Sequence, residues 1–305
     1  MTISIEYLAS VFNSVLRYMT PILLVALCAG VCSKVKVFNI ALEGTLLISA
    51  FFAFLTQYFV RNIVIAVLVA VLVGMLVTFI MSFFIVRLKG EPMIVGMAIN
   101  TFALGFTTFL LSMIFKTKGA VSDPTMSGLP KITLPVISEI PILSTMFASL
   151  TTVDYLAFFM AIVMYIIMYK TVIGFRLRAI GINDKAASSL GINVKRYQIV
   201  APTLAGGMIG LAGCLLSLGS VTLVIQNISS ARGYVARAAN NLCQGHPLGA
   251  LLSSALFGFT TALSYVLQNT AAKQQLLNCI PYIATIVAMA VYNYIMKRKS
   301  NALKL

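Results

Sequence analysis

Acidic residues are scarce in this sequence, which has 7 Asp and Glu among 305 residues against 22 Lys and Arg. Charged residues of both signs make up only 10% of the chain, whereas soluble domains carry about 25%. So low a charge content excludes an ordinary soluble domain. The scarcity of acids also counts against an ion-coupled transporter, which typically places several acids within its membrane spans.

The groups that enzymes use for chemistry are equally sparse. The chain has one histidine, His246, and five cysteines, of which Cys28 and Cys32 lie one helical turn apart. Few acids remain to complete a metal site, so we expect the cysteines to pack within apolar spans and predict no metal site. The sequence contains no Gly-x4-Gly-Lys-Ser/Thr phosphate-binding loop. We therefore predict that the chain is not an enzyme, needs no cofactor, and depends on a separate ATPase subunit for any ATP-driven work.

Long apolar runs are what the sequence has instead. Hydrophobic residues make up 60% of the chain, and its mean hydropathy is +1.00. Four uncharged runs each exceed the roughly 20 residues that a helix needs to cross the hydrocarbon core: residues 63–86, 93–115, 198–230 and 247–272. The alternation of a membrane barrel is absent, so helices must satisfy the backbone. We predict a single transmembrane permease domain over residues 1–305, an all-α polytopic bundle of about eight to ten membrane-spanning helices.

The expected spans are residues 10–32, 38–60, 63–86, 93–115, 153–169, 198–218, 248–267 and 279–295. Two other segments leave the number of crossings open. Residues 231–246 resemble a short polar helix that crosses part of the membrane, shielded by protein. Residues 1–33 contain either one membrane crossing or two.

Basic residues between the spans predict the orientation. Basic pairs follow the first and third expected spans, at Lys34 with Lys36 and at Arg87 with Lys89, and more basic residues occur throughout residues 170–197. All of these can face the cytoplasm, which favours Lys and Arg near membrane spans. Membrane orientation thus explains the net charge of +15, and we predict no nucleic-acid partner.

The cytoplasmic segment 170–197 contains the signals of a short helix. Asn183 and Asp184 form a good N-cap, and Gly191 is a good C-cap. A short capped helix presented between two spans is either a docking element or an ordinary solvated loop. If it is a docking element, we expect the residues that couple to the ATPase to be Asp184, Ala186, Ala187 and Gly191.

The same segment resembles the cytoplasmic coupling loop of ABC importer permeases. The loop of that family has the form Glu-Ala-Ala-x3-Gly, followed nine residues later by Ile-x-Leu-Pro. This chain has Ala186-Ala187-x3-Gly191, with seven rather than nine intervening residues before Ile199-x-Ala-Pro202, and Lys185 stands in place of the acid.

Two further stretches narrow the resemblance to one branch of these permeases. Residues 39–44, Asn-Ile-Ala-Leu-Glu-Gly, are similar to the Asn-Ile-Gly-x-Glu-Gly stretch of the branch that handles branched-chain amino acids, simple sugars and nucleosides. Residues 233–236 and 245–249 resemble its Gly-Phe-x-x-Ile-Ala element and its Gly-x-x-x-Pro-x-Gly turn. Within the branch, the chain looks most like nucleoside permeases, of the purine nucleoside type linked to a basic membrane lipoprotein.

This resemblance implies a permease subunit of an ATP-driven importer in the bacterial cell membrane, forming the path for a small polar solute such as a nucleoside or simple sugar. The implied partners are an ABC ATPase subunit, a second permease subunit that is identical or different, an extracellular substrate-binding lipoprotein, and membrane lipid. An ion-coupled secondary transporter and an ABC permease for branched-chain amino acids are the alternatives.

Glu43 is the candidate site residue with the clearest physical signal. It lies within the apolar run 37–48, one turn from Asn39. A carboxylate in that position is costly and needs a partner or a function. It either belongs to a polar patch or gate on the translocation path, or ties the structure together by capping a broken helix or pairing with a basic residue. Neutral amides suit an uncharged solute, and the weaker path candidates are Asn100, Gln226, Asn227, Asn240 and Asn241.

Small residues crowd the span 198–218, where they allow another helix to approach closely. This contact lies either at the pore or a subunit boundary, or it is generic packing within the bundle. The glycines involved are Gly206, Gly207, Gly210 and Gly213.

Overall fold

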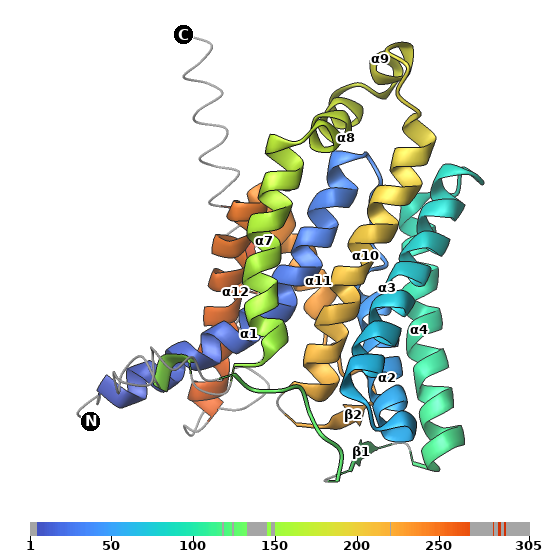
Figure 1. Cartoon of the computed structure of the whole chain (residues 1–305). Helices are drawn as coiled ribbons and strands as arrows, with labels where there is room; N and C mark the ends of the chain where they lie inside the picture. The colour runs from blue at the N-terminus through green and yellow to red at the C-terminus, as the bar shows by residue number, and fades with distance from the viewer. Residues whose placement is uncertain are drawn as a thin grey trace.

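The computed structural model describes residues 5–117, 119–123, 125–132, 145–147, 150–219 and 221–268, with four single positions beyond them. Within these residues, seven helices are long and apolar enough to cross a membrane. They run roughly side by side in one bundle (Figure 1). The predicted all-α polytopic architecture is confirmed.

The long helices match the expected spans closely. They are α1 (Ile5–Lys34), α2 (Leu42–Val60), α3 (Ile63–Val86), α4 (Pro92–Phe115), α7 (Thr152–Lys170), α10 (Val194–Leu218) and α12 (Pro247–Gln268). Three shorter helices are α8 (Val172–Ile182), α9 (Asp184–Ser189) and α11 (Arg232–Cys243), and two strands are β1 (Ala120–Ser122) and β2 (Leu223–Ile225). The expected span 279–295 lies outside the described residues, apart from single positions.

Side-chain caps account for several helix starts. Asn62 accepts hydrogen bonds from the first backbone N–H groups of α3, and Asn193 does the same for α10. Thr151 and Asp154 form a reciprocal capping box at the start of α7. These polar residues interrupt apolar sequence, so they set where each span begins.

The prediction was wrong about the start of the second span. Residues 35–41 are not helical, and α2 begins at Leu42 rather than at residue 38. α1 ends because the N–H groups of residues 35 and 37 both turn back to the Cys32 carbonyl, and Lys36 adopts a left-handed φ of 58°. The chain therefore passes between α1 and α2 as a seven-residue non-helical segment, which we call the linker 35–41.

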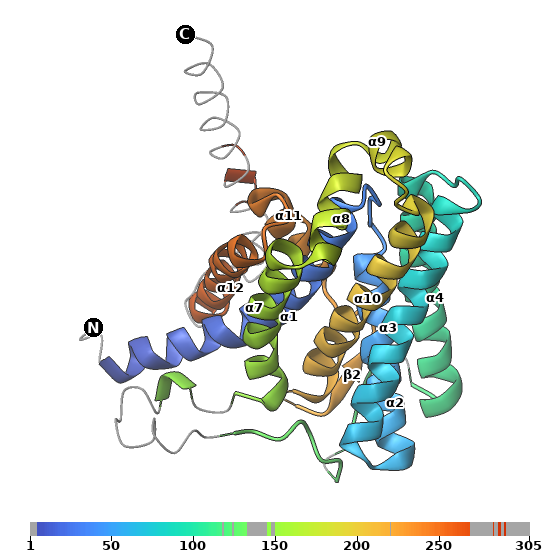
Figure 2. The same ribbon diagram turned by 45° about the horizontal axis from the view of Figure 1, so that its top comes forward.

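α1 is one continuous helix of 30 residues, so residues 5–34 make a single pass and not two. It is the most enclosed helix, with 89% of its most apolar window buried, against 28% for α3 and 22% for α4. α12 and α7 lie on one side of α1, and α3 and α4 lie on the other (Figures 1 and 2). α3 and α4 expose large apolar side chains, as helices at the edge of a membrane bundle do.

α10 packs closely against α3 along glycine residues, a contact that we call the glycine seam. A Cβ added to Gly206 would lie 2.6 Å from the Gly74 carbonyl oxygen, and one added to Gly210 would lie 2.6 Å from the Cα of Val71. Gly213 meets the backbone of α2 in the same way, whereas a Cβ added to Gly207 would meet side chains of α3, at 3.2 Å from Val71 and 3.6 Å from Met75. Backbones this close leave no space for a side chain between the helices.

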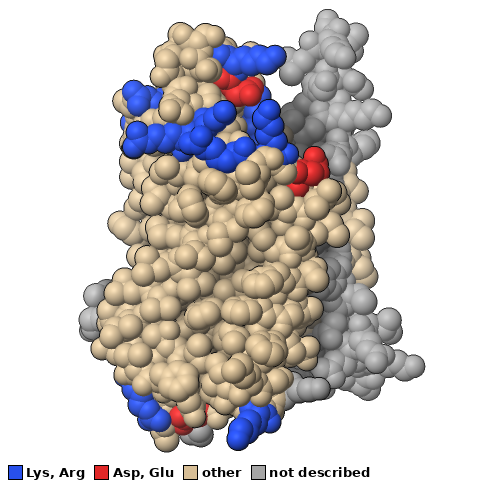
Figure 3. Space-filling model, turned by 90° about the vertical axis from the view of Figure 1, so that its right-hand side faces the viewer, with Lys and Arg blue, Asp and Glu red and all other residues tan. Residues whose placement is uncertain are grey.

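The two ends of the bundle differ in charge. Lys and Arg gather at the end that carries α8 and α9, which we call the basic end (Figure 3). The opposite end, which we call the far end, carries the antiparallel pair β1 and β2. This short ribbon was not predicted, because three-residue strands leave no periodic signal in the sequence.

Candidate functional site

Glu43, at the start of α2, binds the start of α11 through its carboxylate. Oε1 accepts hydrogen bonds from the Ser229 hydroxyl (2.5 Å) and the Ala231 N–H (2.8 Å), and Oε2 accepts one from the Gly233 N–H (2.7 Å). Glu43 is only 7% exposed, so these three donors surround a buried carboxylate. We call this group of four residues the Glu43 clasp.

Helix geometry explains how a buried charge is tolerated in the clasp. The first N–H groups of a helix have no partner within it, and the helix dipole favours negative charge there. Glu43 lies in the first turn of α2 and binds the first turn of α11, so two helix N-termini face one carboxylate. Position 233 admits no side chain, because a Cβ there would lie 2.6 Å from the Cα of Glu43.

Asn100 of α4 caps the start of α2 beside the clasp. Its Oδ1 accepts from the Gly44 N–H (2.7 Å), and its Nδ2 donates to the Ile40 carbonyl (3.0 Å) and the Tyr234 hydroxyl (3.0 Å). Asn100 thus joins α4, the linker 35–41 and α11. The structure therefore brings two of the predicted site residues, Glu43 and Asn100, to the same helix junction.

Asn39 and Asn240 form a second group nearer the basic end. Asn240 donates from Nδ2 to the Ser33 hydroxyl (3.1 Å), and the Nδ2 of Asn39 lies 3.7 Å from the Cys32 sulfur. Both amides are buried, and within the described part of the chain their Oδ1 atoms have no hydrogen-bond partner. Within the described residues, the hydrogen bonds of Asn39 and Glu43 go to different partners. Because the linker is not helical, the expected one-turn spacing of the two residues on one helix is lost.

Asn241 differs from the other predicted path residues because it is exposed. It lies two turns beyond Tyr234, so both side chains project from the same face of α11. Tyr234 is 49% exposed. Phe38 of the linker is also exposed, and the Arg237 guanidinium lies 4.2 Å from its ring centroid. The exposed face of α11 is therefore polar and aromatic.

The expected short helix in segment 170–197 is present as α9, with the expected caps. Asn183 accepts from the Lys185 and Ala186 N–H groups (both 3.1 Å). At the other end, Gly191 has a φ of +80°, and the Ile192 N–H donates back to the Ala187 carbonyl (3.1 Å). α9 stands at the tip of the basic end (Figures 1 and 2).

α9 has a buried face and an exposed face. Ala187 is 2% exposed and packs with Val35 and Val37 of the linker. Ala186 is exposed, and two large apolar side chains at the tip, Ile182 and Leu190, are 83% and 81% exposed.

Polar contacts also join α9 and its neighbours to the linker 35–41. Lys36 Nζ lies 3.2 Å from Asp184 Oδ1, and this hydrogen bond holds the pKa of the Asp184 carboxyl below its usual value. Gln198 of α10 donates to the Val35 carbonyl (3.0 Å). The linker therefore contacts α9 at one end and leads into the Glu43 clasp at the other.

Comparison with known proteins gives the family. The profile of the family described as branched-chain amino acid transport system / permease component matches residues 11–292. The chain belongs to this permease family. The permease is 28% identical over 296 residues to the guanosine ABC transporter permease protein NupQ of Bacillus subtilis, covering 93% of this chain and 92% of that protein.

Two further relatives cover similar lengths. The permease is 26% identical to the nucleoside ABC transporter permease protein NupC of Lactococcus lactis, covering 94% of this chain and 93% of the relative. It is 25% identical to the putative glucose ABC transporter permease protein TsgC13 of Haloferax volcanii, covering 93% and 92%. Among solved structures there is no significant match.

Sequence reasoning missed several residues that the permease uses around Glu43. Gly233 and Tyr234 were visible as part of a family motif, but the pairing considered for Glu43 was with a basic residue, and the structure places backbone N–H groups and the Ser229 hydroxyl there instead. Ser229 had no signal of its own in an uncharged run. The contacts of Lys36 with Asp184 and of Gln198 with the Val35 carbonyl lie between the expected spans 10–32 and 38–60, where nothing in the sequence indicated a partner.

Proposed function

We propose that the permease is the membrane subunit of an ATP-driven importer for a nucleoside or a related simple sugar. The observation that carries this proposal is the continuous contact from α9, through the linker 35–41, to the Glu43 clasp. A separate ATPase would dock on α9, and the linker would transmit its movement to the clasp. The basic end then faces the cytoplasm, as the distribution of Lys and Arg favours.

The surface of α9 supports its assignment as the docking element. Ile182 and Leu190 expose apolar side chains at a tip that projects beyond the bundle into the aqueous, basic end of the molecule. Buried Ala187 fixes α9 on the linker, so a partner that moves the tip would also move residues 35–37. Asp184, Ala186 and Gly191 lie on or beside this tip.

The geometry of the clasp supports a role for Glu43 in stabilising one conformation of the path, either the closed or the open one. A carboxylate that accepts three hydrogen bonds is used as a tie between α2 and α11, and we propose this role for Glu43 rather than direct contact with solute. The exposed polar face of α11, with Tyr234 and Asn241, is the better candidate for the path itself. We propose that Asn39 and Asn240 support this face from behind.

The proposed partners follow from the same arrangement. The relatives whose names mention guanosine, nucleosides and glucose are named as ABC transporter permeases. We therefore propose an ATPase subunit at the basic end, a second permease subunit against the exposed face of the bundle, and a substrate-binding lipoprotein at the far end.

Uptake by proteoliposomes that contain the complete transporter tests the proposal. We expect ATP-dependent uptake of radiolabelled guanosine or glucose that persists when ion gradients are dissipated. Leu190→Asp should reduce co-purification of the ATPase at least about tenfold, whereas Ile132→Asp, which adds the same charge at the far end, should not. Uptake that needs an ion gradient and no ATP, or selective uptake of leucine, would contradict the proposal.

A further inference from the structure

A cavity of about 390 Å³ opens between the far-end parts of α1, α7, α10 and α12. Its volume falls within the roughly 300–1,000 Å³ typical of small-molecule sites. The lining residues come from helix ends, such as Thr151 before α7, Gly219 after α10 and Tyr265 in the last turn of α12. The cavity therefore lies on the side of the bundle opposite to α9.

An aromatic pair forms one edge of this cavity. The rings of Tyr18 and Tyr265 stack with their centroids 5.0 Å apart and an interplanar angle of 14°. Tyr265 is 45% exposed, so the pair is not sealed within the bundle. Stacked tyrosines offer a flat apolar surface with polar tips, which suits a flat ring that also forms hydrogen bonds.

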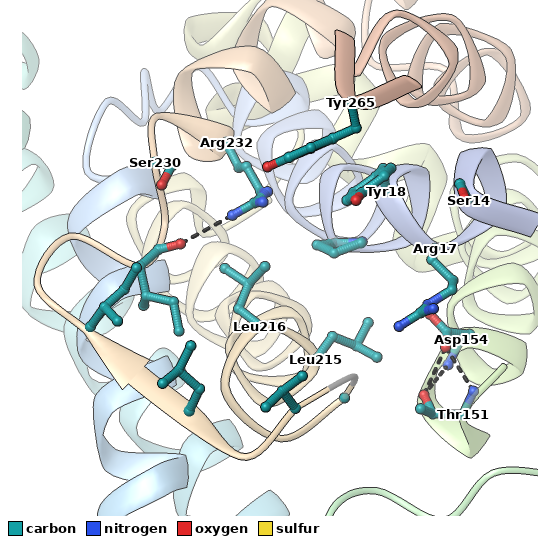
Figure 4. A pocket seen from close by; sticks show the side chains of 16 residues that line it. Ser14, Arg17, Tyr18, Thr151, Asp154, Leu215, Leu216, Ser230, Arg232 and Tyr265 are labelled. Atoms are coloured by element: carbon teal, nitrogen blue, oxygen red, sulfur yellow. Dashed lines mark hydrogen bonds between the residues drawn. The ribbon is translucent and has the colours of Figure 1, made fainter. Parts of the chain in front are cut away.

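Charged groups flank the aromatic pair. Arg232 and Arg17 lie on either side of it, and apolar Leu215 and Leu216 face it across the cavity (Figure 4). Asp154 also lines the cavity, but its carboxylate already accepts hydrogen bonds from Thr20 and Thr151. The polar surface near the rings therefore includes the guanidinium N–H donors of Arg232.

Arg232 connects the cavity to the Glu43 clasp. Within the described residues, Arg232 donates from Nη1 to the Ile228 carbonyl (3.0 Å) and the Ser229 carbonyl (3.5 Å), and a guanidinium has five N–H donors. Ser230 and Ile228 line the cavity, while Ser229 and Ala231 donate to Glu43. One short stretch, residues 228–233, thus forms a wall of the cavity and half of the clasp.

We infer that this cavity binds the base of a nucleoside on the far side of the permease, and that its occupancy acts on the clasp through residues 228–233. This inference rests on the proposed import function and narrows its substrate class. A nucleobase combines a planar ring, which extends the tyrosine stack, with carbonyl and ring-nitrogen acceptors for arginine donors. A sugar lacks the planar ring, and a simple anion has no flat surface that can stack on the tyrosine rings.

Direct binding to the purified permease in nanodiscs, without ATPase or lipoprotein, tests the inference. We expect guanosine to bind saturably by saturation-transfer NMR, with the strongest transfer to base protons. Tyr265→Leu should weaken binding about tenfold, because it removes the stacking surface. Tyr265→Phe keeps the ring and should stay within about threefold of the original affinity. Size-exclusion profiles and ATPase co-purification of both variants control for folding.

Several outcomes would overturn the inference. They are absent guanosine binding to a folded permease, equal loss in Tyr265→Phe and Tyr265→Leu, and competition by glucose or inorganic phosphate as effective as by guanosine. If the complete transporter still imports guanosine in those cases, the proposed function stands and only this site is wrong. If the complete transporter imports neither nucleoside nor sugar, the proposed function itself fails.

Discussion

The glycine seam and the Glu43 clasp hold helices together in opposite ways. In the seam, α10 and α3 meet through backbone at Gly206, Gly210 and Gly74, where an added Cβ would collide with main-chain atoms. In the clasp, α2 and α11 meet through one side chain that accepts three hydrogen bonds. One contact depends on shape along a whole helix, and the other on one carboxylate.

This difference indicates which parts of the bundle move together. Closely packed backbones have one arrangement that fits, so α3 and α10 behave as a single unit. Hydrogen bonds from one carboxylate can be exchanged for others when a helix end shifts. We therefore expect the clasp, and not the seam, to change during transport.

The largest expected effect comes from filling the seam. Gly210→Leu places a side chain where a Cβ already lies 2.6 Å from the Cα of Val71, so α10 and α3 must separate. Overpacking of this kind costs about 3 kcal/mol or more. We expect almost no monodisperse permease after detergent extraction, as measured by size-exclusion chromatography.

Gly105 of α4 provides the matched control for that experiment. A Cβ added at Gly105 meets nothing within 4 Å. Gly105→Leu should leave the yield unchanged or raise it, because leucine is the better helix former by roughly 1 kcal/mol. Equal yields of the two variants would show that the seam does not hold the bundle together.

A smaller loss is expected from weakening the clasp. Glu43→Gln keeps one oxygen acceptor but turns an amide N–H₂ toward a backbone N–H, and hydrogen bonds to charged groups contribute about 1.5–3 kcal/mol. We expect the variant to fold with stability lower by about 2 kcal/mol, read from its thermal unfolding in detergent. Glu91→Gln changes an exposed acid without a cap hydrogen bond and should have no measurable effect.

The Asn100 cap beside the clasp should contribute less to stability than the clasp itself. Asn100→Ala removes the acceptor for the Gly44 N–H and should cost about 1 kcal/mol, as N-cap replacements do. Tyr234→Phe removes only the hydroxyl that Asn100 contacts. Because both variants lose the same bond, their combined cost should be less than the sum of the two. Strict additivity in a double-mutant cycle would exclude this shared bond.

The smallest effect is expected at the ion pair of Lys36 and Asp184. Both side chains are nearly half exposed, so Asp184→Asn should change stability less than the seam, clasp and cap variants above. The folded-state pKa of Asp184 is depressed, so its contribution is present above the unfolded pKa and is lost as pH falls through the lower, folded pKa. We therefore expect the small excess stability of the original protein over the variant to be present at pH 7 and to shrink as the pH falls below about 4, as read from thermal unfolding at each pH. An excess that grows as the pH falls through that range would contradict this assignment.

Much of the fold could be predicted because apolar runs in lipid must be helices, and their ends have visible caps. The expected span 63–86 has the bounds of α3, and the Asn183 and Gly191 signals located α9. Residues 35–37 were expected between two spans, but the non-helical conformation of residues 38–41 could not be predicted, since their mostly apolar sequence continues the pattern of the following span. The conformation of the linker 35–41 depends on Asn100, Gln198 and α9, which are distant in sequence.

The site was predictable only as a set of costly residues. A carboxylate within an apolar run must have a partner or a function, which singled out Glu43, whereas Asn100 was only one of several amides expected to suit an uncharged solute. The donors that surround Glu43 depend on where α11 begins. The N-cap of α11 is Ala231, with a left-handed φ of 63°, and an alanine gives no sequence signal for a helix start. The cavity beside Tyr18 and Tyr265 is likewise formed by helices from both ends of the chain.

The amount of nucleoside imported per ATP hydrolysed tests most directly whether α9 acts on the clasp. In proteoliposomes, Leu190→Asp should lower uptake and hydrolysis together, because it removes the docked ATPase. Glu43→Gln should keep the ATPase bound and hydrolysing while uptake per ATP falls at least about tenfold. Uptake per ATP that is unchanged in Glu43→Gln would contradict the account.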